Sequence, residues 1–452
     1  MKLIPYYETQ FEEVIMAISY LNTLAQYYVN LTLNKARYDE WDVYWNTDRP
    51  YWRKETFDYW RDYKIYPYIK LDDRAEGLTL QQIYDESDHL ISGLKEYRLS
   101  AFSYEFERID YLIDHTINLK TRCAVLLGHK ITFDEMTEGC YNLVAPEFDY
   151  SKIDLLLDEI NQAIPGQKSV PEKIIEWEQK LTLPREGVAQ VISYASTFFH
   201  NCAVNNMPCP KDDMPRIRFR DLGGKKEFLT ILFGYDYDRV IYERNFALDF
   251  PWVVDKIIEM IGHEMEPGHL TFFHARLQEA IDELKPEMQI IAQYSPSSAF
   301  SEGAARMATY MCFDNNMDTL VEYERENIFK LGHLDLGLVE LMPLWHKYRV
   351  LSNYVKLEVT RNRWDKKWSS EEAGIYLEKY GICKKGLGKT ICDNLAGDDG
   401  HFVAHDYARD VVIDYFKTFT SSTKEQWDLY YKLCHSNMSM KGIADKTYSV
   451  SI

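Results

Sequence analysis

The chain has 452 residues, 46% of them hydrophobic, which is enough to bury a sizeable core. Its formal net charge of -19 argues against nucleic acid as a partner, because phosphate binding needs a field of Lys and Arg that this surface lacks on average. No run reaches the roughly 20 apolar residues of a membrane span, and the N-terminus lacks the apolar core of a secretory signal. We therefore expect no membrane partner.

No Ser/Gly-rich tract, charge block or internal repeat divides the chain. We expect one large domain over residues 1–452, whose subdivision, if there is one, separates a helical lobe (1–210) from a metal-binding catalytic lobe (211–452). The cysteines show no CxxC spacing, which is typical of reduced thiols and predicts a cytoplasmic location. They are residues 123, 140, 202, 209, 312, 383, 392 and 434.

Helical spacing of apolar residues covers most of the first half of the chain, over 8–130, 152–164 and 186–200. The period then changes, and 216–220, 227–233 and 239–242 read as strands of a small sheet. From Trp252 the helical pattern returns, first in a helix with a buried stripe of Val253, Ile257, Ile258 and Ile261 that runs into His263. Later helices are expected over 270–285, 302–313, 317–331, 335–358, 370–380, 398–419 and 423–436. The predicted fold class is mainly α with a minor sheet before the metal-binding helix.

The most informative stretch is His263-Glu264-Met265-Glu266-Pro267-Gly268-His269. Neutral imidazoles are common metal ligands, and metallopeptidases carry their general base directly after the first His. In an unbroken helix the two His would point about 240° apart, because one turn takes 3.6 residues. Pro removes a backbone donor and Gly tolerates unusual dihedrals, so Pro267-Gly268 can break the helix and let both imidazoles face one ion.

A catalytic zinc site uses three protein ligands and one open position. The third candidate is Glu302, which we expect at the start of a later helix, 39 positions after His263. Glu264 would then act as general base for the attacking water, and Glu259, one turn before His263, as a residue that orients a ligand.

Two other interpretations of the stretch are weaker. Two helix-end His satisfied by backbone groups would leave Glu264, Pro267-Gly268 and Glu302 unexplained. A ferritin-like Glu266-x-x-His269 pair needs the motif twice, and no second helix carries it in that form.

His401 and His405 lie four residues apart on an expected helix, so both face one way. In the cleft of a metal-dependent hydrolase a distant His, Tyr or Arg often stabilises the oxyanion. We assign that role to His405 and Tyr407, with His401 and Arg409 as further candidates. A surface helix with capping residues, or a separate second metal at His401/His405, are the alternatives.

The string HE-x-x-PGH, followed by Glu302-Gly303, resembles the family catalogued as domain of unknown function 885. That family is similar to gluzincin-type zincin peptidases and to the helical fold of carboxypeptidase Taq. The resemblance covers about 215–420, including Trp368-Ser369-Ser370-Glu371-Glu372-Ala373. It implies a helical shell around a deep cleft, with His263, His269 and Glu302 as metal ligands and Glu264 as base.

The chain departs from that family at Leu270, where a second His is usual, at Ala304, where Trp is usual, and near residue 400, where a Pro-Gly-Gln segment is expected. These departures put the substrate class in doubt and leave the ligands intact.

The sequence thus predicts a zinc-dependent hydrolase, a peptidase or an enzyme acting on a small amide. Two His and one carboxylate also suit Fe²⁺ or Mn²⁺, so a non-hydrolytic metal enzyme is the alternative. A metal-free binding scaffold is the third interpretation.

Overall fold

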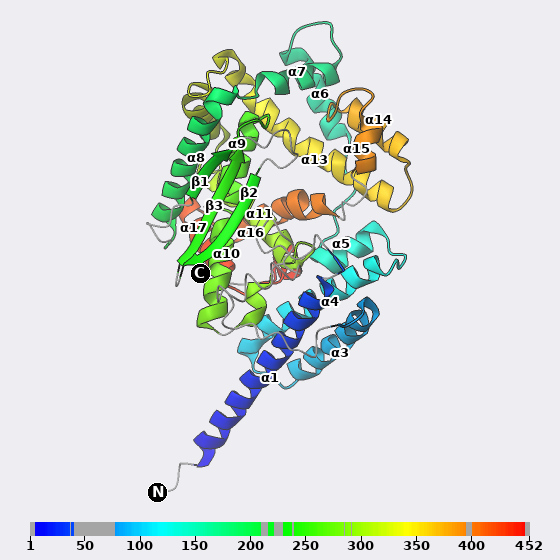
Figure 1. Ribbon diagram of the computed structural model, residues 1–452, viewed down its shortest axis with the longest axis vertical. Coiled ribbons are helices and arrows are strands. Elements are labelled where there is room, and N and C mark those ends of the chain that lie inside the picture. The colour runs from blue at the N-terminus through cyan, green and yellow to red at the C-terminus, as the bar shows by residue number, and fades with distance from the viewer. Residues whose placement is uncertain are drawn as a thin grey trace.

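Helices make up most of this computed structural model, so the mainly helical fold class expected from the sequence is confirmed (Figure 1). The structure describes residues 5–36, 38–39, 77–208, 216–220, 229–236, 239–283, 285–290, 292–394 and 400–447. Cys209 lies outside these residues. Within them, no helix is both long enough and apolar enough to cross a membrane.

Some of the helices before the sheet begin with a capping box. Thr79 and Thr132 each accept a hydrogen bond from the backbone N–H three residues on, and the side chains of Gln82 and Glu135 accept one from the backbone N–H of the cap residue. In Figure 1, α1, α3 and α4 lie together at one end of an elongated molecule. The elements are α1 (Pro5–Lys35), α3 (Leu80–Arg98), the 3₁₀ turn η2 (Ser103–Glu105), α4 (Phe106–Leu126), α5 (Phe133–Tyr141), α6 (Ser151–Ala163), α7 (Val170–Lys180) and α8 (Arg185–Asn206).

Three strands follow, β1 (Arg216–Arg220), β2 (Leu229–Asp236) and β3 (Arg239–Ala247), and they overlap the strand ranges expected from the sequence. They form a sheet of order β1-β3-β2, in which β3 runs parallel to β1 and antiparallel to β2. β3 ends shortly before α9 (Val254–Glu264), the helix that carries His263.

The second half of the chain is helical again. Two of its elements, η4 and η6, are single π-helical turns. The elements are α10 (His269–Asp282), η3 (Pro286–Gln289), α11 (Pro296–Met311), α12 (Met317–Glu324), η4 (Arg325–Phe329), η5 (Leu336–Leu341), α13 (Met342–Trp364), α14 (Ser370–Lys379), α15 (Gly388–Asn394), η6 (Val403–Tyr407), α16 (Ala408–Phe419), α17 (Thr423–Cys434) and α18 (Met440–Ala444).

Glu302 does not stand at a helix start, as the sequence suggested, but in the second turn of α11. The helix begins earlier because Ser295 caps it, its Oγ accepting from the Ser298 backbone at 3.1 Å, and because Pro296 at the first helical position has no donor to satisfy.

The metal motif lies between two hydrophobic clusters. One joins apolar residues of α7, α8, α9 and α13, including the predicted stripe of Ile257, Ile258 and Ile261, all buried. The other joins α5, α10, α11, α16 and α17. Helix α9 belongs to the first cluster and α11 to the second. The two helices, which carry His263 and Glu302, pack against each other where the clusters meet. The predicted lobe boundary at 210/211 stays a prediction; α8, before it, packs directly against α9, after it.

Candidate metal centre

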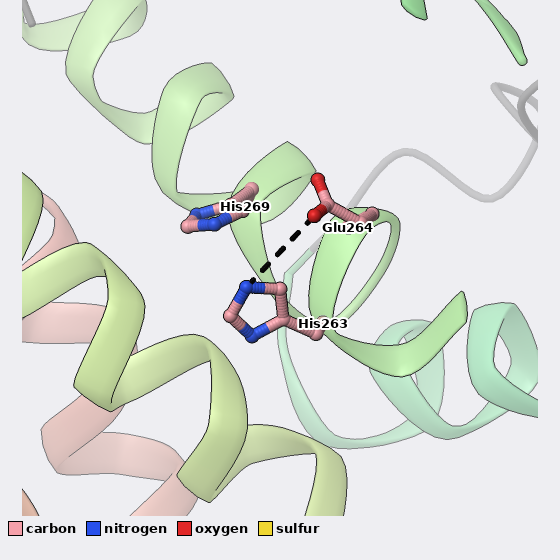
Figure 2. Close-up of side chains that lie close together, drawn as sticks. All are labelled: His263, Glu264 and His269. Atoms are coloured by element: carbon pink, nitrogen blue, oxygen red, sulfur yellow. Dashed lines mark ion pairs between the residues drawn. The ribbon is translucent and has the colours of Figure 1, made fainter. Parts of the chain in front are cut away.

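The helix breaks where the sequence predicted. Helix α9 ends at Glu264, α10 begins at His269, and Met265 to Gly268 form a turn that includes a cis Glu266–Pro267 bond. Gly268 passes so close to the preceding turn that a Cβ on it would overlap the His263 carbonyl oxygen and lie 2.6 Å from that of Gly262. Only glycine fits this approach. Figure 2 shows His263, Glu264 and His269 close together around the turn.

Two distant residues hold the turn from outside. The Tyr430 hydroxyl, on α17, donates to the Pro267 carbonyl oxygen at 2.6 Å. His200, on α8, pairs with Glu266 through Nδ1 in a buried contact. Neither residue was singled out from the sequence, because nothing in their local pattern points to a partner so far along the chain.

His263, His269 and Glu302 converge, as predicted. His263 Nε2 lies 2.9 Å from Glu302 Oε2, and His269 Nε2 lies 3.1 Å from Glu302 Oε1. The two imidazole centroids are 4.4 Å apart and their planes are inclined by 74°. Both His side chains are buried.

Two glycines allow the helices to approach this closely. A Cβ on Gly262, in α9, would lie 2.6 Å from Thr309 Cγ2 of α11 and 2.8 Å from Phe199 Cε1 of α8. A Cβ on Gly303, in α11, would lie 2.7 Å from the carbonyl oxygen of Ala408, where α16 begins. The residue beside each metal-binding candidate is therefore the one that lets its helix come near enough.

Burial sets the charge states of the cluster. It lowers the pKa of His263, an effect that His269 reinforces and Glu302 opposes. Burial alone would raise the pKa of Glu302, but His405, His269 and His263 together hold it well below its usual value. The cluster thus presents a neutral imidazole and an ionised carboxylate, the forms in which these groups bind metals.

His269 is oriented by a residue that the sequence reasoning missed. Its Nδ1 lies 2.8 Å from the Ser301 hydroxyl, which leaves Nε2 directed at Glu302. Metal-binding imidazoles are commonly fixed by such a contact on their other nitrogen. The only sequence signal was the position of Ser301 directly before Glu302.

Glu264 lies beside the converging side chains. Its Oε1 is 4.0 Å from His263 Nε2, and the side chain is 22% exposed, so solvent reaches the carboxylate. The ligand atoms of His263, Glu264 and His269 lie within 4.8 Å of one another.

His405 also reaches the centre. Its Nδ1 lies 2.9 Å from Glu302 Oε2, and it forms a second group of converging ligand atoms with His263 and Glu302. His401 lies against His405, with centroids 3.7 Å apart. Tyr407 has no hydrogen bond or ion pair with any described residue and packs against the second hydrophobic cluster instead.

Arg306, another residue that the sequence reasoning missed, joins three elements. It pairs with Glu259 of α9 at 2.9 Å and with Asp406 of η6 at 2.7 Å. Glu259 therefore contacts Arg306, whereas His263 Nδ1 is buried with no hydrogen-bond partner among the described residues. The structure therefore shows Glu259 paired with Arg306 and not in the direct contact with His263 by which it was expected to orient that ring. Arg409 pairs with Asp410 at 2.6 Å.

A small polar pocket adjoins His263. Its volume is about 40 Å³, room for a few water molecules. Charged and polar side chains line most of it, among them Asp255, Glu259, Arg306, Arg349 and Arg409.

The donor set fits a divalent ion. Ligands about 2.1 Å from one ion lie roughly 3.0–3.4 Å apart, depending on the angle between them. The imidazole-to-carboxylate distances of 2.9 and 3.1 Å are close to that range. Glu302 Oε2 is buried and, among the described residues, has no hydrogen-bond partner despite two nitrogens at 2.9 Å. A carboxylate oxygen in that state is suited to bind a cation.

Comparisons with known proteins add little to this geometry. No protein-family model matches the chain, and no curated protein matches it. A solved structure described as "the putative lipoprotein from Colwellia psychrerythraea" is similar at a TM-score of 0.49 and 12% sequence identity, over 81% of this chain and 69% of that one. A likeness at this level identifies neither a family nor an activity, so the functional argument comes from the site itself.

Proposed function

We propose that this chain is a metal-dependent hydrolase that cleaves an amide bond, and that its substrate is a peptide or a small amide. The observation that carries the proposal is the convergence of His263, His269 and Glu302 at a helix break, with Glu264 beside them. The resemblance of the motif to gluzincin-type peptidases supports the same assignment. Zn²⁺ is the ion we propose, and the cytoplasm is the location.

The position of each residue gives it a role in the proposed reaction. His263, His269 and Glu302 would hold the ion, which supplies a Lewis acid for the carbonyl and lowers the pKa of water. Glu264, adjacent but partly exposed, takes the proton from the attacking water and returns it to the leaving amine. Ser301 keeps the His269 ring in the orientation that presents Nε2.

Replacing Glu264 with Gln tests the mechanism. We expect Glu264→Gln to lower kcat by about 10²–10⁴-fold, the usual contribution of a general base, with the metal content unchanged. Wild type and variant would be screened against peptide and acyl-amide libraries, with bound metal measured in the same preparations.

Glu279→Gln is the matched control, since Glu279 lies further along α10 and pairs with Lys285 at 3.1 Å, away from the cluster. Its activity should equal that of wild type. Full activity in the Glu264 variant would rule out the proposed mechanism.

An iron or manganese enzyme of non-hydrolytic type is the second candidate. The observation that favours it is the third imidazole, His405, since additional ligands suit ions of higher coordination number. Metal analysis of protein purified without added metal discriminates the two: near-stoichiometric iron with no zinc would favour this candidate over the hydrolase.

A further inference from the structure

One oxygen of Glu302 is approached by two imidazoles. Both His263 Nε2 and His405 Nδ1 lie 2.9 Å from Oε2, whereas His269 Nε2 faces Oε1 at 3.1 Å. His405 comes from η6, which lies far along the chain from the His263 motif. The ligand set predicted from the sequence therefore omits His405, whose imidazole contacts the same carboxylate.

Both contacts at Oε2 are ion pairs at 2.9 Å. Among the described residues this buried oxygen has no hydrogen-bond partner, although both nitrogens are near enough. Two ligands of one ion also lie about 3 Å apart when the angle between them is near 90°. The ligand atoms of His263, Glu302 and His405 lie within 4.8 Å of one another, so one ion can touch all three.

The backbone holds His405 in this position. It lies in a π-helical turn, a distortion frequently found at functional sites. The next residue, Asp406, anchors the turn by accepting hydrogen bonds from Arg306 at 2.7 Å and Asn353 at 2.9 Å. Gly303 lets α11 approach the end of the same turn at Ala408.

We propose that His405 is a further ligand of the metal centre, which then has three imidazoles and one carboxylate. The inference rests on the proposed function and replaces the oxyanion role expected for His405. Catalytic zinc sites usually have three protein ligands. With four, an open position for water requires an ion that accepts five or more ligands.

Metal affinity and ligand counting test the proposal on the full-length protein. Removing an outer partner of a ligand typically weakens metal binding by about 10–100-fold. We expect His405→Ala to weaken Zn²⁺ binding by more than about 100-fold in competition with a chelator, whereas His435→Ala, at the residue directly after α17, stays within threefold. X-ray absorption of the zinc-loaded wild type should count three coordinated imidazoles, and of the variant two.

The outcomes separate the two proposals. A wild-type centre with two imidazoles, or a His405 variant that binds zinc with an affinity within 100-fold of wild type and an unchanged count, overturns the role of His405 and leaves the hydrolase standing. A wild-type chain that binds no divalent ion overturns both. If His405→Ala fails to fold by circular dichroism, the imidazole count of the wild type decides alone.

Discussion

Ser301 contributes to the centre without being a ligand itself. Its hydroxyl is 2.8 Å from His269 Nδ1 and fixes which nitrogen faces Glu302. We expect Ser301→Ala to weaken metal binding by roughly 10–100-fold, because the ring loses the contact that orients it. Isothermal titration with Zn²⁺ measures the change.

Ser298→Ala is the control for that experiment. Ser298 lies one turn earlier on α11, and only its backbone nitrogen takes part in the cap with Ser295. Its zinc affinity should match wild type. Equal affinities for the two variants would mean that Ser301 does not orient the ring.

At this scale the sequence predicts the proposed ligands better than the residues that hold them in position. His263, Glu264 and His269 stand within seven residues, so their spacing carries the chemistry, and Glu302 follows in a recognisable Glu-Gly pair. Arg306 and Tyr430 carry no such pattern. Arg306 is significant only because Glu259 and Asp406, 47 and 100 positions away, meet it in space.

Among the elements, α11 and the start of α16 approach each other backbone to backbone beside the site. A Cβ on Gly303 would lie 2.7 Å from the Ala408 carbonyl oxygen and 3.0 Å from the Arg409 backbone nitrogen. Because backbone cannot give way as a flexible side chain can, we expect Gly303→Ala to lower the free energy of unfolding by about 1–3 kcal/mol and to weaken zinc binding. Urea unfolding and zinc titration measure the two effects.

Gly93→Ala is the control, because an added Cβ at Gly93 has room. A Cβ at Gly93, in the middle of α3, would meet only Leu24 Cδ2, at 4.0 Å. Alanine is the better helix former by about 1 kcal/mol, so this variant should be as stable as wild type or more so. If Gly303→Ala were equally stable, the close approach of the helices would not constrain the site.

Element boundaries mark the limit of the sequence pattern. Apolar spacing locates α9, α14 and α17 nearly to the residue, and Ser369 starts α14 with a capping box that includes Glu372. Apolar spacing places the start of α11 too late, because the first turn, which begins at Pro296, contains Ser rather than large apolar residues. The π turn of His405 could not be predicted, since it results from the packing of η6 against α11 and α13.

For the whole molecule, His115 joins the N-terminal helices to the helix of Glu302. Its Nε2 lies 2.8 Å from Ser297 Oγ on α11, and burial lowers its pKa to about 3. The unfolded chain binds this proton below about pH 6.5, whereas the folded chain does not until about pH 3. Acidification from pH 6.5 to 5 should therefore lower the free energy of unfolding by roughly 2 kcal/mol through this one residue.

Urea unfolding of the metal-free protein at pH 7 and pH 5 checks that expectation. The difference between the two pH values should shrink by about that amount in His115→Gln, because glutamine does not titrate. An undiminished difference in the His115 variant would contradict the assignment.

Contacts of this kind explain why the arrangement of the whole could not be predicted. His115 and Ser297 are 182 positions apart, and no periodicity relates α4 to α11. Fold class follows from the helical spacing alone, but which helices enclose the centre depends on such pairs.

The bond from Tyr430 to the Pro267 carbonyl has a consequence for the order in which the protein is made. Its two residues are 163 positions apart, and Tyr430 on α17 is the later of the two. During synthesis, His263, His269 and Glu302 therefore leave the ribosome long before Tyr430. The Tyr430 hydroxyl holds the turn between His263 and His269. The nascent chain carries the proposed ligands before it has the contact that holds the turn between two of them, and the centre is completed only after α17 has emerged.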